Sequence, residues 1–151
     1  GNASGINDGA VALISGSKDA EKIIGRKHIA KMLASAAMGI EPCIMGAGPI
    51  EAIKLALKRA ELSLDEMDII EINEAFASQV LSCLKGLNLD FNDSRINPNG
   101  GAIALGHPLG ASGARLTLTV ARELQRSQKK YAVISLCIGV GQGLAMVIER
   151  I

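Results

Sequence analysis

Two apolar segments at the C-terminal end constrain the fold of this 151-residue chain more than any other feature. They comprise residues 131–138 and 144–151, and only the five residues 139–143 separate them. Parallel strands need a crossover connection of about a dozen residues or more, so a connection this short forces the two strands to pair antiparallel. We therefore expect the chain to end in an antiparallel hairpin.

The sequence before this hairpin alternates predicted strands with predicted helices. Continuous or alternating apolar residues predict strands over residues 11–14, 28–37 and 68–72. The Ala and Lys content of the second strand leaves a helix as an alternative there. Helices are expected over residues 17–24, 49–61 and 76–87, and after residue 113 with Leu116, Val120 and Leu124 on one face. This order indicates one α/β domain over residues 1–151, a mixed five-stranded sheet with helices on both faces.

Composition excludes several classes of protein. The 16 basic and 15 acidic side chains give a net charge of +1, and the chain has no Trp, one Tyr and two Phe, so a nucleic-acid-binding surface is not expected. A hydrophobic content of 48% with 21% charged residues excludes disorder. The longest apolar stretch, residues 131–148, is interrupted by Ser135, Gln142 and three glycines, so no membrane span is expected.

The cysteines and the first residues indicate a compartment. Cys43, Cys83 and Cys137 are odd in number and widely spaced, which favours a reducing environment over a disulfide framework or a metal site. The chain starts in a Gly/Asn/Ser loop without a charged-then-apolar signal pattern, so a cytoplasmic location is expected.

A glycine-rich loop over residues 99–113 is the most informative stretch for chemistry. Five glycines surround His107 just ahead of a predicted helix, which indicates that something approaches this backbone closely. A phosphate-binding loop would need Lys-Ser/Thr where His107-Pro108 stands, and the glycines of residues 139–143 lie between two strands, so neither a phosphate-binding loop nor a dinucleotide-binding loop is expected. A histidine held at a helix start suits acid–base or oxyanion chemistry, and the alternative is a histidine that only caps the loop.

Two further polar positions follow predicted strands. Cys137 ends the strand before residues 139–143, and Asn73 ends the strand over residues 68–72. Open sheets present functional groups at such strand ends. Each residue also has a structural interpretation, because a cysteine in an apolar strand is commonly an inert core residue and Asn73 is a good helix N-cap.

Together these residues resemble the thiolase family, the CoA-dependent enzymes that cleave or form 3-oxoacyl-CoA. Five blocks match the family in order and cover essentially the whole chain, and the block around His107 is the most specific of them. The blocks are Gly1-Asn-Ala-Ser-Gly-Ile-Asn-Asp-Gly-Ala10, Ile44-Met-Gly-Ala-Gly-Pro-Ile50, Asn73-Glu-Ala-Phe-Ala77, Asn99-Gly-Gly-Ala-Ile-Ala-Leu-Gly-His-Pro-Leu-Gly-Ala-Ser-Gly-Ala-Arg115 and Cys137-Ile-Gly-Val-Gly-Gln-Gly143.

The resemblance implies a thiolase-like C-terminal half and a role for each matched residue. It makes His107 the group that activates a nucleophilic cysteine and, with a water on Asn73, binds the thioester oxygen. It makes Cys137 the acid–base for the acetyl carbon and gives the Gly139 N–H to a second oxyanion hole. It places substrate-binding positions at Ser4, Met45, Ala75 and Phe76, while Cys43 and Cys83 are expected to be structural. CoA and acyl-CoA are then substrates, and neither a cofactor nor a metal is expected.

The resemblance also implies what lies outside this sequence. The nucleophilic cysteine of thiolases belongs to the N-terminal half, which no residue here matches, so the isolated chain is expected to be inactive without that half as part of the same chain or as a separate subunit. A homodimer or homotetramer is expected. Asn97-Pro-Asn-Gly100 and Cys137-Ile-Gly-Val-Gly141 favour a degradative 3-oxoacyl-CoA or 3-oxoadipyl-CoA type.

Two alternative functions are open to a chain with this resemblance. One is a non-catalytic thiolase-like module for CoA binding or subunit association, which the intact His107, Cys137 and Asn73 disfavour. The other is a decarboxylating condensing enzyme, whose sites generally use two histidines, and Cys137 disfavours it.

Overall fold

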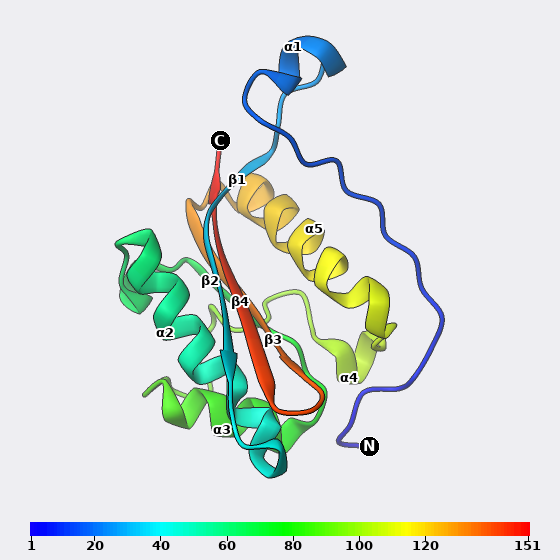
Figure 1. Ribbon diagram of the computed structural model, residues 1–151, viewed down its shortest axis with the longest axis vertical. Coiled ribbons are helices and arrows are strands. Elements are labelled where there is room, and N and C mark those ends of the chain that lie inside the picture. Colours follow the sequence, from blue (N-terminus) through cyan, green and yellow to red (C-terminus); the bar gives the residue numbers. More distant parts are fainter.

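The structure, a computed structural model, describes all residues 1–151 and is built on one four-stranded mixed sheet (Figure 1). The strand order is β1-β4-β3-β2, antiparallel except for the parallel pair β2–β3. The strands are β1 (Ala30–Gly39), β2 (Ile69–Ile72), β3 (Tyr131–Ile138) and β4 (Gln142–Arg150). The helices are α1 (Ala20–Ile24), η1 (Pro42–Ala47), α2 (Gly48–Ala60), η2 (Leu64–Glu66), α3 (Ala77–Gly86), α4 (Ala102–Leu105) and α5 (Leu109–Ser127).

Helices cover both faces of the sheet, as predicted. Figure 1 shows α2 and α3 on one side of the strands and α5 on the other. Alternate strand residues point to opposite faces, so Val133 packs with Ile53 of α2 while Ile134 packs with Leu116 and Leu124 of α5. Two apolar layers therefore hold the sheet between its helices.

The predicted hairpin is confirmed. β3 and β4 pair antiparallel along their whole length, with Cys137 opposite Gly143 at the closed end. In the turn, Val140 and Gly141 both have positive φ angles, 70° and 89°, a region that β-branched residues rarely adopt. The turn is therefore strained at Val140.

The strand predicted over residues 28–37 is confirmed as β1, which begins two residues later and ends two residues later, at Ala30–Gly39, so the helical alternative is wrong. β1 pairs antiparallel with β4 and has one irregularity between Met32 and Ala34. A strand partner outweighs the weak helical preference of its Ala and Lys residues, because the paired backbone satisfies its hydrogen bonds in the sheet.

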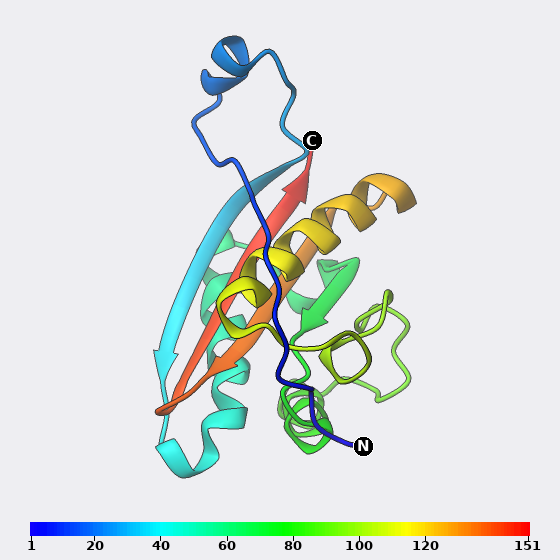
Figure 2. The ribbon, with the colours of Figure 1, turned by 90° about the vertical axis from the view of Figure 1, so that its right-hand side faces the viewer.

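The predicted strand over residues 11–14 is wrong, and the sheet has four strands in place of five. This segment pairs with no strand, and Leu13 and Ile14 are exposed. Figure 2 shows the dark blue N-terminal segment crossing α5 on its outer side, away from both edges of the sheet. An apolar run forms a strand only where a neighbouring backbone accepts its hydrogen bonds, and none lies beside it here.

The expected glycine-rich loop is shorter than predicted because α5 begins at Leu109. Pro108 is the N-cap, and its carbonyl accepts the N–H groups of Ala111 and Ser112 at 2.8 and 2.9 Å. Pro108 suits this place because it sets the backbone at the helix entrance and needs no N–H partner. The first turn of α5 therefore belongs to the glycine-rich stretch and lies directly after His107.

Two glycines bring the hairpin and α2 into backbone contact. A Cβ at Gly143 would collide with the Gly48 carbonyl and lie 2.7 Å from the Pro49 nitrogen. A Cβ at Gly48 would lie 2.7 Å from the Gln142 oxygen. This contact fixes the start of β4, and with it the paired end of β3, against the first turn of α2.

None of the helices combines the length and the apolar character needed to cross a lipid bilayer.

Candidate active site

Asn73 lies directly after β2 and is held by its backbone and its neighbours. Its N–H donates to the carbonyl of Ser135 on β3 at 2.9 Å. The Asn97 side chain brackets Ile72, the residue before Asn73, with two hydrogen bonds to its backbone. Asn97 Oδ1 accepts the Ile72 N–H at 2.8 Å, and Asn97 Nδ2 donates to the Ile72 carbonyl at 2.9 Å. The Asn73 side chain is almost fully buried, and its Oδ1 has no hydrogen-bond partner. An orphaned buried acceptor of this kind suits a bound water.

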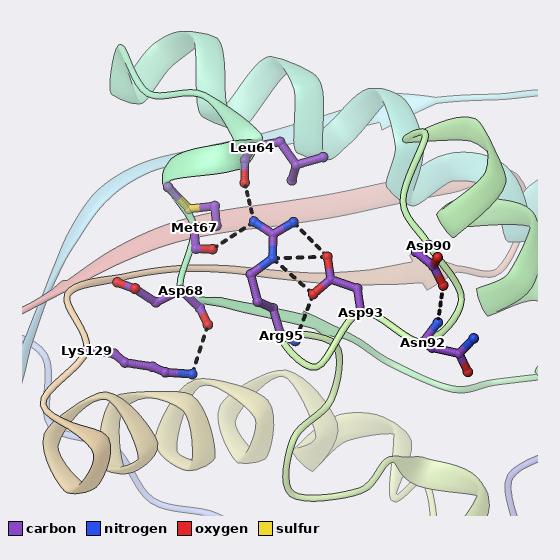
Figure 3. A network of polar contacts seen from close by, with 8 residues as sticks. All are labelled: Leu64, Met67, Asp68, Asp90, Asn92, Asp93, Arg95 and Lys129. Atoms are coloured by element: carbon purple, nitrogen blue, oxygen red, sulfur yellow. Dashed lines mark hydrogen bonds and ion pairs between the residues drawn. The ribbon is translucent and has the colours of Figure 1, made fainter.

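A polar network around Arg95, two residues before Asn97, holds the loop that leads to Asn97 (Figure 3). Arg95 pairs with Asp93 at 2.7 Å and donates to the carbonyls of Leu64 and Met67 at 3.2 and 3.1 Å. The bonds to Asp93 raise the pKa of Arg95. Because the network ties the loop before Asn97 to η2, it fixes the residue that brackets the end of β2.

The glycines around His107 accommodate side chains of the protein itself. A Cβ at Gly101 would collide with the Glu74 carboxylate, which accepts the Ile103 N–H at 3.1 Å. Gly106 has a φ of 96°, and a Cβ there would collide with Asn7. The expected close approach to this backbone is therefore present, and Glu74 and Asn7 make it.

His107 contacts three separate segments of the chain. Its N–H donates to the carbonyl of Gly5 at 3.0 Å, which ties it to the N-terminal segment. Its Nε2 lies 3.4 Å from Asn73 Nδ2, and its Nδ1 lies 2.6 Å from Ser112 Oγ. Burial, followed by the positive charge of Arg115, lowers the pKa of His107. The imidazole is therefore neutral at pH 7 and able to accept a proton.

Cys137 lies at the end of β3 with a buried thiol. Burial raises the pKa of this thiol, so it stays protonated at neutral pH. Alternation along β3 places it on the face of Val133, toward α2 and α3, and its thiol makes no hydrogen bond with His107 or Asn73. Gly139 follows in the turn, with no atom within 4 Å of the place a Cβ would occupy. The structure thus brings His107 and Asn73 together and leaves Cys137 at the neighbouring strand end.

The expected substrate-binding residues fall into two places. Ser4 joins Ala75, whose carbonyl accepts the Ser4 N–H at 3.1 Å and the hydroxyl at 3.3 Å. Phe76 forms a bridge with the N-terminal segment and is half exposed. Met45 lies in η1, which packs against α3.

The other two cysteines differ from each other. Cys83 is buried in the larger core cluster, with its Sγ 3.3 Å from the carbonyl of Gly46, and burial raises the pKa of its thiol to about 11. This burial in the core is consistent with the structural role expected for Cys83. Cys43 is exposed at the start of η1.

Sequence reasoning missed a pair of buried charges. Glu71 is 1% exposed, and both of its carboxylate oxygens lack a hydrogen-bond partner. The three guanidinium nitrogens of Arg115 on α5 are equally buried and unpartnered. Burial raises the pKa of Glu71 to about 7, and the nearby Arg115 opposes that rise. Glu71 precedes Asn73 by two residues, so both project toward α5, where Arg115 lies.

Comparisons with known proteins agree with this arrangement. The family described as "Thiolase, C-terminal domain" matches residues 26–150. A beta-ketoadipyl-CoA thiolase of Acinetobacter baylyi is 59% identical over all 151 residues. A 3-oxoadipyl-CoA/3-oxo-5,6-dehydrosuberyl-CoA thiolase of Escherichia coli is 53% identical over the same span. Each match includes the whole of this chain but only 38% of the length of the relative.

A solved structure shows the same fold. Human mitochondrial 3-ketoacyl-CoA thiolase superposes with a TM-score of 0.95 and 52% sequence identity, over 100% of this chain and 38% of that one. The same human protein has also been solved in complex with CoA, with the same TM-score and coverage.

Proposed function

The chain belongs to the thiolase family, and from this membership we propose that it supplies the C-terminal catalytic part of a CoA-dependent thiolase that cleaves or forms 3-oxoacyl-CoA. The proposal concerns the complete protein, since this chain spans 38% of its curated relatives. Cleavage of a carbon–carbon bond beside a thioester needs a thiolate nucleophile, a site for the developing oxyanion and a proton donor for the departing carbon. The chain contains candidates for the last two and for the base that activates the first.

The observation that carries the proposal is the contact between His107 and Asn73, two residues 34 positions apart in the sequence. A neutral His107 accepts the proton of the nucleophilic cysteine, which the N-terminal half would supply. The resulting imidazolium and a water held by the orphaned Asn73 Oδ1 then stabilise the enolate oxygen of the departing acetyl-CoA. Both residues stand where a strand or loop ends, so small displacements of either would separate them.

Cys137 completes the proposed reaction as its acid. Its buried thiol stays protonated at neutral pH, so it can deliver a proton to the C2 carbon of the enolate as the C2–C3 bond breaks. In the condensation direction the thiolate removes that proton again. The Gly139 N–H is the proposed donor to the oxyanion of the acylated nucleophile.

We propose that the complete protein is a degradative thiolase that acts on 3-oxoacyl-CoA substrates and prefers 3-oxoadipyl-CoA. Support comes from the two bacterial relatives at 59% and 53% identity, whose names specify beta-ketoadipyl-CoA and 3-oxoadipyl-CoA. The human structure at 52% identity is named for 3-ketoacyl-CoA, which fits the broader part of the same proposal.

The test is CoA-dependent thiolysis by the complete protein. We expect acetyl-CoA to form from 3-oxoadipyl-CoA with a higher kcat/KM than from acetoacetyl-CoA or a long-chain 3-oxoacyl-CoA. Cys137→Ala removes the proton donor and is expected to reduce kcat by at least about 100-fold, the lower range for a general acid. Cys43→Ala is the matched control, because this cysteine is exposed and lies outside the site.

Two results would contradict the proposal. Wild-type turnover by Cys137→Ala would remove this cysteine from the reaction. Saturable CoA binding without cleavage of any of the three substrates would favour a non-catalytic module for CoA binding or subunit association.

A further inference from the structure

We infer that Ser112 is a positioning residue that fixes the proton of His107 on Nδ1 and leaves Nε2 as the base. This inference rests on the proposed function, because it concerns how the proposed base is kept in its working form. Nothing in the glycine-rich sequence singles Ser112 out.

Ser112 lies in the first turn of α5 and is fully buried. Its Oγ is 2.6 Å from His107 Nδ1 and 3.2 Å from the carbonyl oxygen of Pro108. Because α5 begins directly after Pro108, the helix start itself places the hydroxyl five residues beyond His107 and against its ring.

The partners determine where the imidazole proton lies. On the far side of the ring, His107 Nε2 faces Asn73 Nδ2, an amide nitrogen that donates and cannot accept. Nε2 must therefore present its lone pair, which leaves the proton of the neutral ring on Nδ1. Ser112 Oγ accepts that proton, and its own hydroxyl hydrogen goes to the Pro108 carbonyl, so each contact joins one donor to one acceptor.

This chain of contacts has a catalytic consequence. A neutral imidazole takes a thiol proton only on the nitrogen that has a free lone pair, so the tautomer decides whether the nitrogen beside Asn73 is a base. With the proton on Nε2 the ring would present a donor there and could not activate a cysteine. Ser112 also accepts a stronger, charge-assisted bond once His107 is protonated, which stabilises the imidazolium.

A purely structural role for the hydroxyl makes a different prediction. Serine hydroxyls inside helices commonly donate to the carbonyl four residues earlier, and Ser127 at the other end of α5 does so to Glu123 at 2.7 Å. Ser112 makes the same bond to Pro108 and in addition contacts the imidazole. Ser127→Ala therefore removes only a hydrogen bond from a serine to a helix carbonyl, whereas Ser112→Ala removes that kind of bond and the contact with the imidazole.

The experiment compares Ser112→Ala and Ser127→Ala in the complete protein, with thiolysis of 3-oxoadipyl-CoA followed from pH 5 to pH 9. We expect Ser112→Ala to lower kcat about 10- to 100-fold, the loss typical when the partner that orients a histidine is removed, while KM changes less than about twofold. We expect the acid limb of its kcat/KM profile to move to lower pH, because the imidazolium has lost its acceptor. Ser127→Ala is expected to match the wild type.

The outcomes separate the two claims. A Ser112→Ala enzyme with wild-type kcat and an unmoved acid limb would overturn the role of Ser112, as would equal losses in both variants. A wild-type protein that binds CoA and cleaves none of the 3-oxoacyl-CoA substrates would instead overturn the proposed function.

Discussion

Replacing Glu71 by Gln is expected to change how the stability of the chain depends on pH. The pKa of Glu71 is raised from 4.5 to about 7 in the fold, so between these values the folded chain binds a proton that the unfolded chain has released. Stability is then lost as the pH rises, the reverse of the trend for a carboxylate in an ion pair. At about 1.4 kcal/mol per pKa unit, Glu71 costs the fold about 3 kcal/mol above pH 7, of which about 2.5 kcal/mol develops between pH 5 and pH 8.

Glu71→Gln keeps the shape of the side chain and removes its ionisation. We expect the variant to be more stable than the wild type by less than about 1 kcal/mol at pH 5 and by about 3 kcal/mol at pH 8. Urea denaturation followed by far-ultraviolet circular dichroism at pH 5, 6, 7 and 8 gives the comparison. The change with pH of His107 is common to both proteins and cancels in the difference.

Glu51→Gln is the control for this experiment. Its carboxylate is exposed on α2 and pairs with Lys54 at 2.8 Å, so its removal is expected to alter stability by less than about 1 kcal/mol at any of these pH values. Parallel pH curves for wild type and Glu71→Gln would refute the reasoning, since they would mean that burial beside Arg115 leaves the ionisation of Glu71 unaltered.

Two further predictions concern backbone contacts that position the site. Gly143→Ala places a Cβ against the carbonyl of Gly48 and is expected to destabilise the fold by about 2 kcal/mol or more, whereas the control Gly113→Ala, in open space within α5, is expected to stabilise it by about 0.5 to 1 kcal/mol. Urea midpoints measure both variants, and equal midpoints would contradict the contact between Gly143 and Gly48. Asn97→Gly keeps the left-handed backbone at φ 42° and loses both bonds to Ile72, with an expected cost of about 2 to 4 kcal/mol in the same assay, and an unchanged midpoint would show that the bracket contributes nothing.

Local signals in the sequence predict most of the fold. The five residues between the last two strands require a hairpin, and Pro49 together with the apolar spacing of residues 50–57 marks α2. Ser63 and Glu66 show the spacing of a capping box, and in the structure the Ser63 N–H donates to the Glu66 carboxylate at 2.8 Å. These features depend on residues close in sequence, so one sequence is enough to identify them.

The errors depend on contacts between distant residues. Residues 11–14 have the composition of a strand, but whether they pair is decided by backbone elsewhere in the chain. The onset of α5 at Leu109 was hidden because Gly110 and Gly113 are typical of loops, although Pro108 marks the helix entrance in retrospect.

The candidate site divides in the same way. His107, Asn73 and Cys137 could be selected from strand ends, a glycine-rich loop and the family resemblance. Ser112 and the buried pair Glu71 and Arg115 could not be selected in this way, because their importance depends on which side chains the fold brings near them.

The contact between Gly48 and Gly143 limits how this part of the protein can vary in sequence. In most packed interfaces a larger side chain on one element can be accommodated by a smaller side chain on the facing element, so substitutions at the two positions are correlated. Here both positions already hold the smallest residue, and what each would strike is backbone. No second substitution can restore the fit, so we expect a functional variant library randomised at these two positions to return glycine at both.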